Sequence, residues 1–195
     1  VSGTVLSSAL QGTNVSITAE PTDSATKGVA KNAADILVNE QITKTYVGKS
    51  VATNLNLTAG RNIVIAQDIN QSHGDKTGAL NITMNAGTTD SVDSSTAHMQ
   101  NNKYGANIIR ANIFTWGGDL TLNGGTYMGL GSDESGTDGT QREVYSAGGD
   151  ITINGDLLMA VGNGTVSLHT TESAMPNDIQ NQGSITITGN INSAN

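Results

Sequence analysis

The chain lacks cysteine altogether and has only two prolines, and aromatic residues make up just 3% of its 195 residues. Without cysteine it can form no disulfide bond, no thiolate metal site and no cysteine nucleophile. The scarcity of proline argues against a proline-rich disordered linker. No apolar run approaches the roughly 20 residues that a transmembrane helix needs, so we expect no insertion into a membrane.

Small polar residues dominate the composition instead. Glycine, asparagine, serine and threonine supply 87 residues, whereas isoleucine, leucine and valine supply 40. Such a chain can bury a long and thin aliphatic core, but it cannot build a bulky aromatic one. Its length suits a single domain.

The net charge of −8 lies entirely in the C-terminal part of the chain. Residues 1–110 carry equal numbers of basic and acidic side chains, whereas residues 111–195 carry Arg142 as their one base against nine acids. An acidic surface repels a phosphate backbone, so we expect no nucleic-acid partner. The charge is typical of a solvated surface that keeps a protein in solution.

Five segments share one spacing of apolar residues, in which the second and third apolar positions lie four residues apart. They are Ile36–Ile42, Ile63–Ile69, Asn107–Ile113, Ile151–Leu157 and Ile185–Ile191. Short alternating strands accompany them: Val15–Ile17, Leu55–Leu57, Leu80–Ile82, Leu120–Leu122 and Val166–Leu168. The alternation places one face of each strand inward and the other outward.

Strands this short cannot bury a face alone, but stacked copies can line one continuous interior. The sequence therefore predicts an all-β fold, a parallel β-helix or solenoid of about five rungs. In this register Ile36, Ile63, Ile151 and Ile185 form one inward column. A twisted antiparallel sandwich is the alternative, but the recurring two-residue hairpin loops that it needs are missing. At the corners, glycine, asparagine and aspartate are expected to supply the positive φ angles of tight turns.

Three long excursions, residues 83–106, 123–150 and 169–184, separate the rungs. Stacking in register would make them leave from one corner, so that the rod has a smooth side and a decorated side. Part of each excursion must be a third strand, for which Thr126–Leu130 is the best candidate. Residues 27–38 could begin with a helical turn, because their alanines have helical spacing. Loops this long are typical of functional or disordered segments, and the decorated side is the expected binding surface.

The runs Gly12–Ala19, Leu55–Ile65 and Gly148–Leu157 combine these strands with their corner residues. They resemble the repeats of large bacterial two-partner-secretion exoproteins, in particular filamentous haemagglutinin and the high-molecular-weight adhesins. The resemblance covers most of residues 12–195 and implies a right-handed β-helical shaft on a Gram-negative surface, exported through an outer-membrane transporter. The secretion module of such exoproteins is not evident, so residues 1–195 are expected to be a single internal segment of the shaft.

No arrangement of residues in the sequence points to catalysis or to a bound metal. His73, His98 and His169 lack the spacing of a preformed metal site, and no nucleotide-binding or nucleophile motif is present. Acidic residues do cluster, at Asp133, Glu134, Asp138 and Glu143. A flexible acidic loop, a calcium site and a glycosidase carboxylate pair are the three interpretations of this cluster. We expect no enzyme activity and no cofactor, with a carbohydrate-active enzyme as the alternative function.

Exposed aromatic rings beside polar side chains are typical of surfaces that bind carbohydrate. The candidate ligand-binding residues lie in or near the excursions: Tyr104, Trp116, Tyr127, Asp133, Glu134, Arg142 and Tyr145. Trp116 and Tyr127 could alternatively cap the apolar interior at a corner. The expected role is adhesion, and the expected partner is a glycan or protein receptor on a host cell or in a biofilm matrix.

Overall fold

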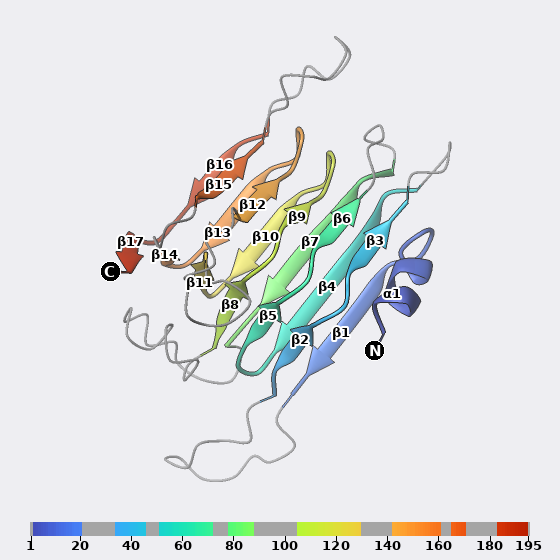
Figure 1. Cartoon of the computed structure of the whole chain (residues 1–195), viewed down its shortest axis with the longest axis horizontal. Helices are drawn as coiled ribbons and strands as arrows, with labels where there is room; N and C mark the ends of the chain where they lie inside the picture. Colours follow the sequence, from blue (N-terminus) through green and yellow to red (C-terminus); the bar gives the residue numbers. More distant parts are fainter. Residues whose placement is uncertain are drawn as a thin grey trace.

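The computed structural model describes residues 2–20, 34–45, 51–71, 78–87, 105–129, 142–160, 165–170 and 183–194. In these ranges the chain forms 17 strands and one short helix, and the strands belong to three parallel sheets. Figure 1 shows the strands of successive coils side by side, with the helix at the N-terminal end. We call the three sheets A, B and C. The chain passes through them in this order, one strand in each, and then returns to sheet A to begin the next coil. The fold is therefore a parallel β-helix, as predicted.

Sheets A and B have six strands each and sheet C has five. Sheet A contains β1 (Val15–Ala19), β4 (Thr53–Ala59), β7 (Leu80–Asn85), β10 (Leu120–Asn123), β13 (Ile151–Asn154) and β16 (Ile185–Ile187). Sheet B contains β2 (Ile36–Val38), β5 (Ile63–Ile65), β8 (Ala106–Ile109), β11 (Gly125–Met128), β14 (Leu157–Ala160) and β17 (Ile191–Ala194). Sheet C contains β3 (Ile42–Lys44), β6 (Ile69–Gln71), β9 (Ile113–Phe114), β12 (Arg142–Tyr145) and β15 (Val166–His169). The predicted third strand at Thr126–Leu130 is confirmed for its first part: β11 begins at Gly125 and ends at Met128, and Leu130 lies outside the described residues.

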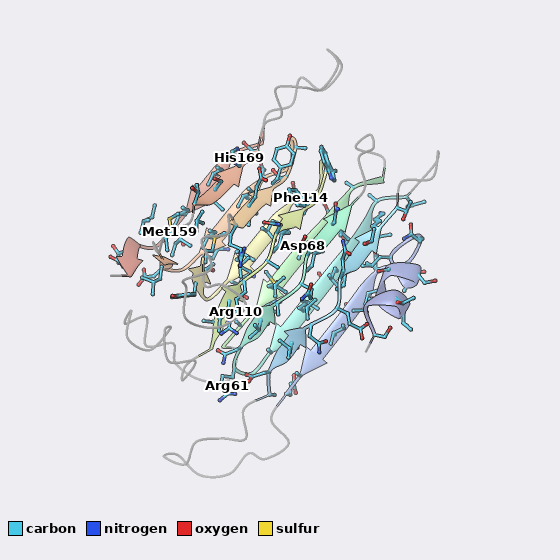
Figure 2. All side chains as sticks on the ribbon, viewed as in Figure 1. Arg61, Asp68, Arg110, Phe114, Met159 and His169 are labelled. Atoms are coloured by element: carbon cyan, nitrogen blue, oxygen red, sulfur yellow. The ribbon has the colours of Figure 1, made fainter. Side chains whose placement is uncertain are left out.

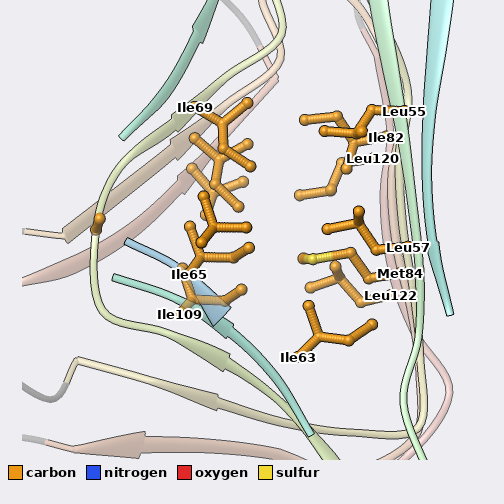
Figure 3. Close-up of a cluster of buried hydrophobic side chains, with 14 of the residues drawn as sticks. Leu55, Leu57, Ile63, Ile65, Ile69, Ile82, Met84, Ile109, Leu120 and Leu122 are labelled. Atoms are coloured by element: carbon orange, nitrogen blue, oxygen red, sulfur yellow. The ribbon is translucent and has the colours of Figure 1, made fainter. Parts of the chain in front are cut away.

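Aliphatic side chains from alternate strand positions fill the interior. In sheet A, Leu55, Ile82 and Leu120 are register partners, and each is at most 1% exposed. Ile65 and Ile69 face this row from sheets B and C, as Figure 3 shows. A fully buried side chain of this size stabilises the fold by about 1.5 to 3 kcal/mol. Stacked aliphatic rows thus replace the aromatic core that the composition excludes.

The predicted inward column of Ile36, Ile63, Ile151 and Ile185 is wrong, because it joins residues of two sheets. Ile36 pairs with Ile63 in sheet B, whereas Ile151 pairs with Ile185 in sheet A. The same apolar spacing occurs at the corner between sheets B and C in the early coils and between sheets A and B in the late ones. Because the same pattern marks two different corners, the sequence alone does not show to which sheet each copy belongs.

Asparagine and aspartate at the corners do not take the predicted positive φ. Among the described residues other than glycine, only Trp116 and Ala147 have a positive φ. The corner side chains instead accept backbone N–H groups from the next coil. The carboxylate of Asp68 accepts the N–H of Asn112 at 2.8 Å, and that of Asp119 accepts the N–H of Asp150 at 2.9 Å. These residues therefore link the coils to one another.

The long connections leave from all three corners rather than from one. The first, after β7, joins sheet A to sheet B; the second, between β11 and β12, joins sheet B to sheet C; the third, after β15, joins sheet C to sheet A. Residues 88–104, 130–141 and 171–182 themselves lie outside the described residues, as do residues 27–33 of the possible helical turn.

The helix α1 (Gly3–Ala9) was not predicted, although Val5, Leu6, Ala9 and Leu10 have helical spacing. It packs beside β3, where a further strand of sheet C would lie, and buries Leu6 and Leu10. The Oγ of Ser7 accepts the N–H of Thr43 at 2.8 Å. The side-chain amide of Gln11 donates to the carbonyl of Thr43 and accepts the N–H of Thr45. Side chains of the helix and of Gln11, which follows it, thus hydrogen-bond backbone groups that would otherwise be unpaired at the edge of sheet C. In the described part of the chain, no helix is long and apolar enough to span a membrane.

Candidate functional site

A column of aromatic side chains lies on the outer face of sheet C. Phe114, Tyr145 and His169 are register partners at the ends of β9, β12 and β15. The ring centroids of Phe114 and Tyr145 are 6.3 Å apart, and those of Tyr145 and His169 are 6.1 Å apart, both edge to face. Figure 2 shows Phe114 and His169 near the same edge of the molecule, with Arg61 at the opposite edge. We call Phe114, Trp116, Tyr145 and His169 the aromatic column.

Trp116 joins this column from the corner that follows β9. Its ring lies 5.2 Å from that of Tyr145, again edge to face. Its φ of 44° is in the left-handed region, where a residue other than glycine costs about 1 to 3 kcal/mol. The hydroxyl of Thr115 closes the corner by donating to the carbonyl of Gly118 at 2.6 Å.

The same corner recurs one coil later without the large ring. Ala147 has a φ of 48°, and the hydroxyl of Ser146 donates to the carbonyl of Gly149 at 2.5 Å. Alanine therefore satisfies the backbone geometry of this corner. The indole of Trp116 is an addition that the turn itself does not require.

Polar acceptors run beside the aromatic column on the same face. Each acceptor lies one position before an inward aliphatic residue of sheet C, which places it on the outer face. These acceptors are Asp68 before Ile69, Asn112 before Ile113 and Glu143 before Val144. Asn112 accepts the N–H of Glu143 at 3.0 Å, so the row is held in register. The carboxylate of Glu143 lies 3.6 Å from Nε2 of His169, and both side chains are nearly half exposed. This ion pair forms only when the imidazole is protonated.

The structure brings together two of the predicted ligand-binding residues, Trp116 and Tyr145. Arg142 lies in the same strand as Tyr145 but shares the inward side of β12 with Val144. Both Arg142 and Tyr145 are buried, at 9% and 8% exposed, so Phe114, Trp116 and His169 supply the more accessible rings of the column. Tyr127 lies on the outer face of sheet B, packed with Ile108 and Leu158, and is 2% exposed. Burial raises the pKa of Tyr127 above its usual value, although the positive charge of Arg110 acts in the opposite direction. Tyr104, Asp133 and Glu134 lie outside the described residues.

Phe114 was missed in the sequence, and His169 was predicted only as a residue of the excursion 169–184, not as the last residue of a strand beside Tyr145. The available signal was their place one residue after the inward Ile113 and Leu168, which puts them on the outer face next to Tyr145. Neither Trp116 nor Tyr127 caps the apolar interior of the solenoid. Trp116 contacts Tyr145 edge to face on the outside of sheet C, and Tyr127 packs on the outer face of sheet B.

The chemistry of this surface suits binding through rings and hydrogen bonds. Aromatic faces and edges contact apolar ligand surfaces, while carboxylate, amide and imidazole groups bind hydroxyl groups. In the described ranges, no group of three histidine or acidic side chains is arranged to hold a metal ion. Neither the protein-family models, nor the curated proteins, nor the solved structures include a match to this chain.

Proposed function

We propose that this chain is a structural and adhesive segment of a secreted bacterial surface exoprotein, and that the aromatic column is its receptor-binding site. The observation that carries the proposal is the row of edge-to-face contacts between Phe114, Tyr145 and His169 along the solenoid. Neighbouring rings are held by parallel strand pairing, so their positions are fixed before a ligand arrives. Preorganisation of this kind lowers the entropic cost of binding.

The receptor is a glycan, or a protein that carries one, on a host cell or in a biofilm matrix. Sugar rings present apolar C–H faces that pack on aromatic side chains and hydroxyl groups that bond to carboxylates and amides. Asp68, Asn112 and Glu143 supply such acceptors along the column. Export of the full-length chain to the cell surface through an outer-membrane transporter belongs to the same proposal.

A binding assay with matched variants tests this function. The purified chain is screened on a glycan array and on host cells, together with Trp116→Ala and His169→Ala. Leu37→Ala is the control, because Leu37 is a 57% exposed apolar side chain on sheet B, away from the aromatic column. We expect both site variants to lose binding and the control to keep it. Binding that survives in both site variants would contradict the proposed site. Release of sugar fragments from a polysaccharide would instead favour the alternative function, a carbohydrate-active enzyme.

A further inference from the structure

The outer face of sheet A carries a second regular array of side chains, separate from the aromatic column. Two outward columns run along the solenoid axis, and every member is serine, threonine or asparagine. The first column is Ser16, Asn56, Thr83, Thr121, Thr152 and Thr186. The second column is Thr18, Thr58, Asn85, Asn123 and Asn154. All of these residues are exposed or half-buried, and we call them the sheet A array.

Hydrogen bonds between coils fix the second column. Asn85 donates to the hydroxyl of Thr58 at 3.1 Å, Asn123 donates to Asn85 at 2.6 Å, and Asn154 donates to Asn123 at 2.8 Å. Each amide that both donates and accepts in this ladder keeps its other N–H and its other lone pair. The amide orientations are therefore set in advance along the column.

A second ladder borders the array at the start of the strands. Asn54 accepts from Asn81 at 2.9 Å, Asn81 accepts the N–H of Asp119 at 3.0 Å, and Asp150 accepts the N–H of Ser184 at 2.7 Å. Untwisted sheets of many strands are unusual and are typically stabilised by side-chain ladders of this kind. Two ladders and an unbroken one-to-one register hold the outward side chains of these six strands in line with one another.

The array repeats in two directions. Neighbouring strands lie about 4.8 Å apart along the axis, and the two columns are two residues, or about 6.6 Å, apart along each strand. A ligand that contacts many members at once must itself repeat at these distances in a plane. The shorter spacing lies close to the oxygen repeat along one edge of the prism face of hexagonal ice, and the longer spacing falls below the repeat along its other edge, so that waters held between the columns would complete the match.

We propose that the sheet A array binds ice, through waters ordered between its two columns. The hydroxyl and amide groups occupy positions where lattice waters would donate and accept hydrogen bonds, and the threonine methyl groups fill the spaces between them. The alternative crystalline ligand is a polysaccharide fibre, but a face that binds sugar rings is expected to present aromatic side chains. The array contains none. The nearest charges on this face are Asp119 and Asp150 in the bordering ladder, and the carboxylate of each accepts a backbone N–H of the next coil.

Ice growth in the presence of the purified chain tests the proposal. Thermal hysteresis, the gap between the melting and freezing points, is measured together with the fraction of protein that partitions into a growing ice hemisphere. We expect a measurable gap and enrichment in ice. Thr121→Tyr places a bulky ring in the middle of the array, on a strand position that tolerates aromatic residues. This variant is expected to lose both effects while keeping its far-UV spectrum and melting temperature.

Thr43→Tyr is the matched control, because Thr43 is a half-buried outward threonine on β3 of sheet C. It should keep thermal hysteresis and ice partition at the level of the parent chain. If Thr121→Tyr does not fold, Thr152→Tyr repeats the test one coil away. Absence of both effects in the parent chain, their survival in the folded array variants, or an equal loss in Thr43→Tyr would overturn the proposal. The outcome is independent of receptor binding, since Trp116→Ala alters another sheet and should leave the ice effects unchanged.

Discussion

The ammonium group of Lys44 lies 2.8 Å from the hydroxyl oxygen of Thr53, inside the solenoid. It also donates to the carbonyl of Val51 at 2.6 Å and to that of Ala79 at 3.1 Å. Lys44 is 0% exposed, and its three acceptors are all neutral. One buried side chain thus joins the turns that follow the first and second coils.

Lys44 makes stability depend on pH. Burial lowers its pKa from the usual 10.5 to about 8. Between these two values the unfolded chain binds more protons than the folded one, so the free energy of unfolding rises with pH across this window. The cost of the buried charge is therefore fully present below pH 8 and is relieved toward pH 10.5.

Lys44→Met lacks this titration and isolates the effect. We expect the urea midpoint of the parent chain, relative to that of the variant, to rise between pH 7.5 and pH 10. Other titrating groups cancel in this difference. Equal pH dependence in the two proteins would show that Lys44 keeps an ordinary pKa in the folded state.

Ile153 is 0% exposed in the aliphatic interior of sheet A. We expect Ile153→Asp to lower the free energy of unfolding by about 3 to 5 kcal/mol, because a carboxylate there loses its water without gaining a partner. The neighbouring Thr152 points outward, so Thr152→Asp should change stability by no more than about 0.5 kcal/mol. Urea denaturation of both variants checks the prediction, and equal effects would contradict the assigned faces.

Asn123 holds the middle of the outer ladder, with Asn85 on one side and Asn154 on the other. Asn123→Ala removes both side-chain hydrogen bonds, and we expect a loss of about 1 to 2 kcal/mol. Thr121→Ala, two residues away on the same face, removes a side chain outside the ladder and serves as the control. Thermal denaturation that gives the same loss in both variants would argue against a stabilising ladder.

Trp116 offers a separation of binding from stability. Trp116→Gly removes its aromatic contact with Tyr145, worth about 0.5 to 1.5 kcal/mol, but relieves a left-handed backbone strain of similar size. We expect a melting temperature close to that of the parent chain and a loss of receptor binding. Ala147→Gly changes the equivalent corner residue one coil later and should keep binding. A large drop in melting temperature for Trp116→Gly would mean that the indole holds the corner together.

The interior was more predictable than the surface. Alternation around Leu55, Leu120 and Ile151 identifies the strands of sheet A, because a period of two with aliphatic residues has one physical meaning here. The assignment of Ile36 and Ile151 to one column failed because their local patterns are alike although their corners differ. Composition and spacing also give no sign that Lys44 turns inward, since that depends on acceptors 7 to 35 residues away.

The candidate site was predictable only in part. Trp116 and Tyr145 stood out as rare aromatic residues, but their contact depends on the coil register, which sets residues about 30 positions apart side by side. Phe114 and His169 enter the same column through that register. A strand pattern fixes which face a side chain occupies, but only the register identifies its neighbour.

The helix α1 covers the edge of sheet C at the N-terminal end of the solenoid. The coils can therefore fold in order, starting from this end. Contacts between coils join residues that are near in the chain: Arg61 meets Asp35 across 26 positions, and Ala106 meets Asn62 across 44. A first coil whose sheet C edge is covered by α1 still presents an open row of backbone groups to the coil that follows. Each later coil can then form on the one before it as the chain is synthesised. Each coil then serves as a template for the next, and no coil needs contacts with a segment far away in the sequence in order to fold.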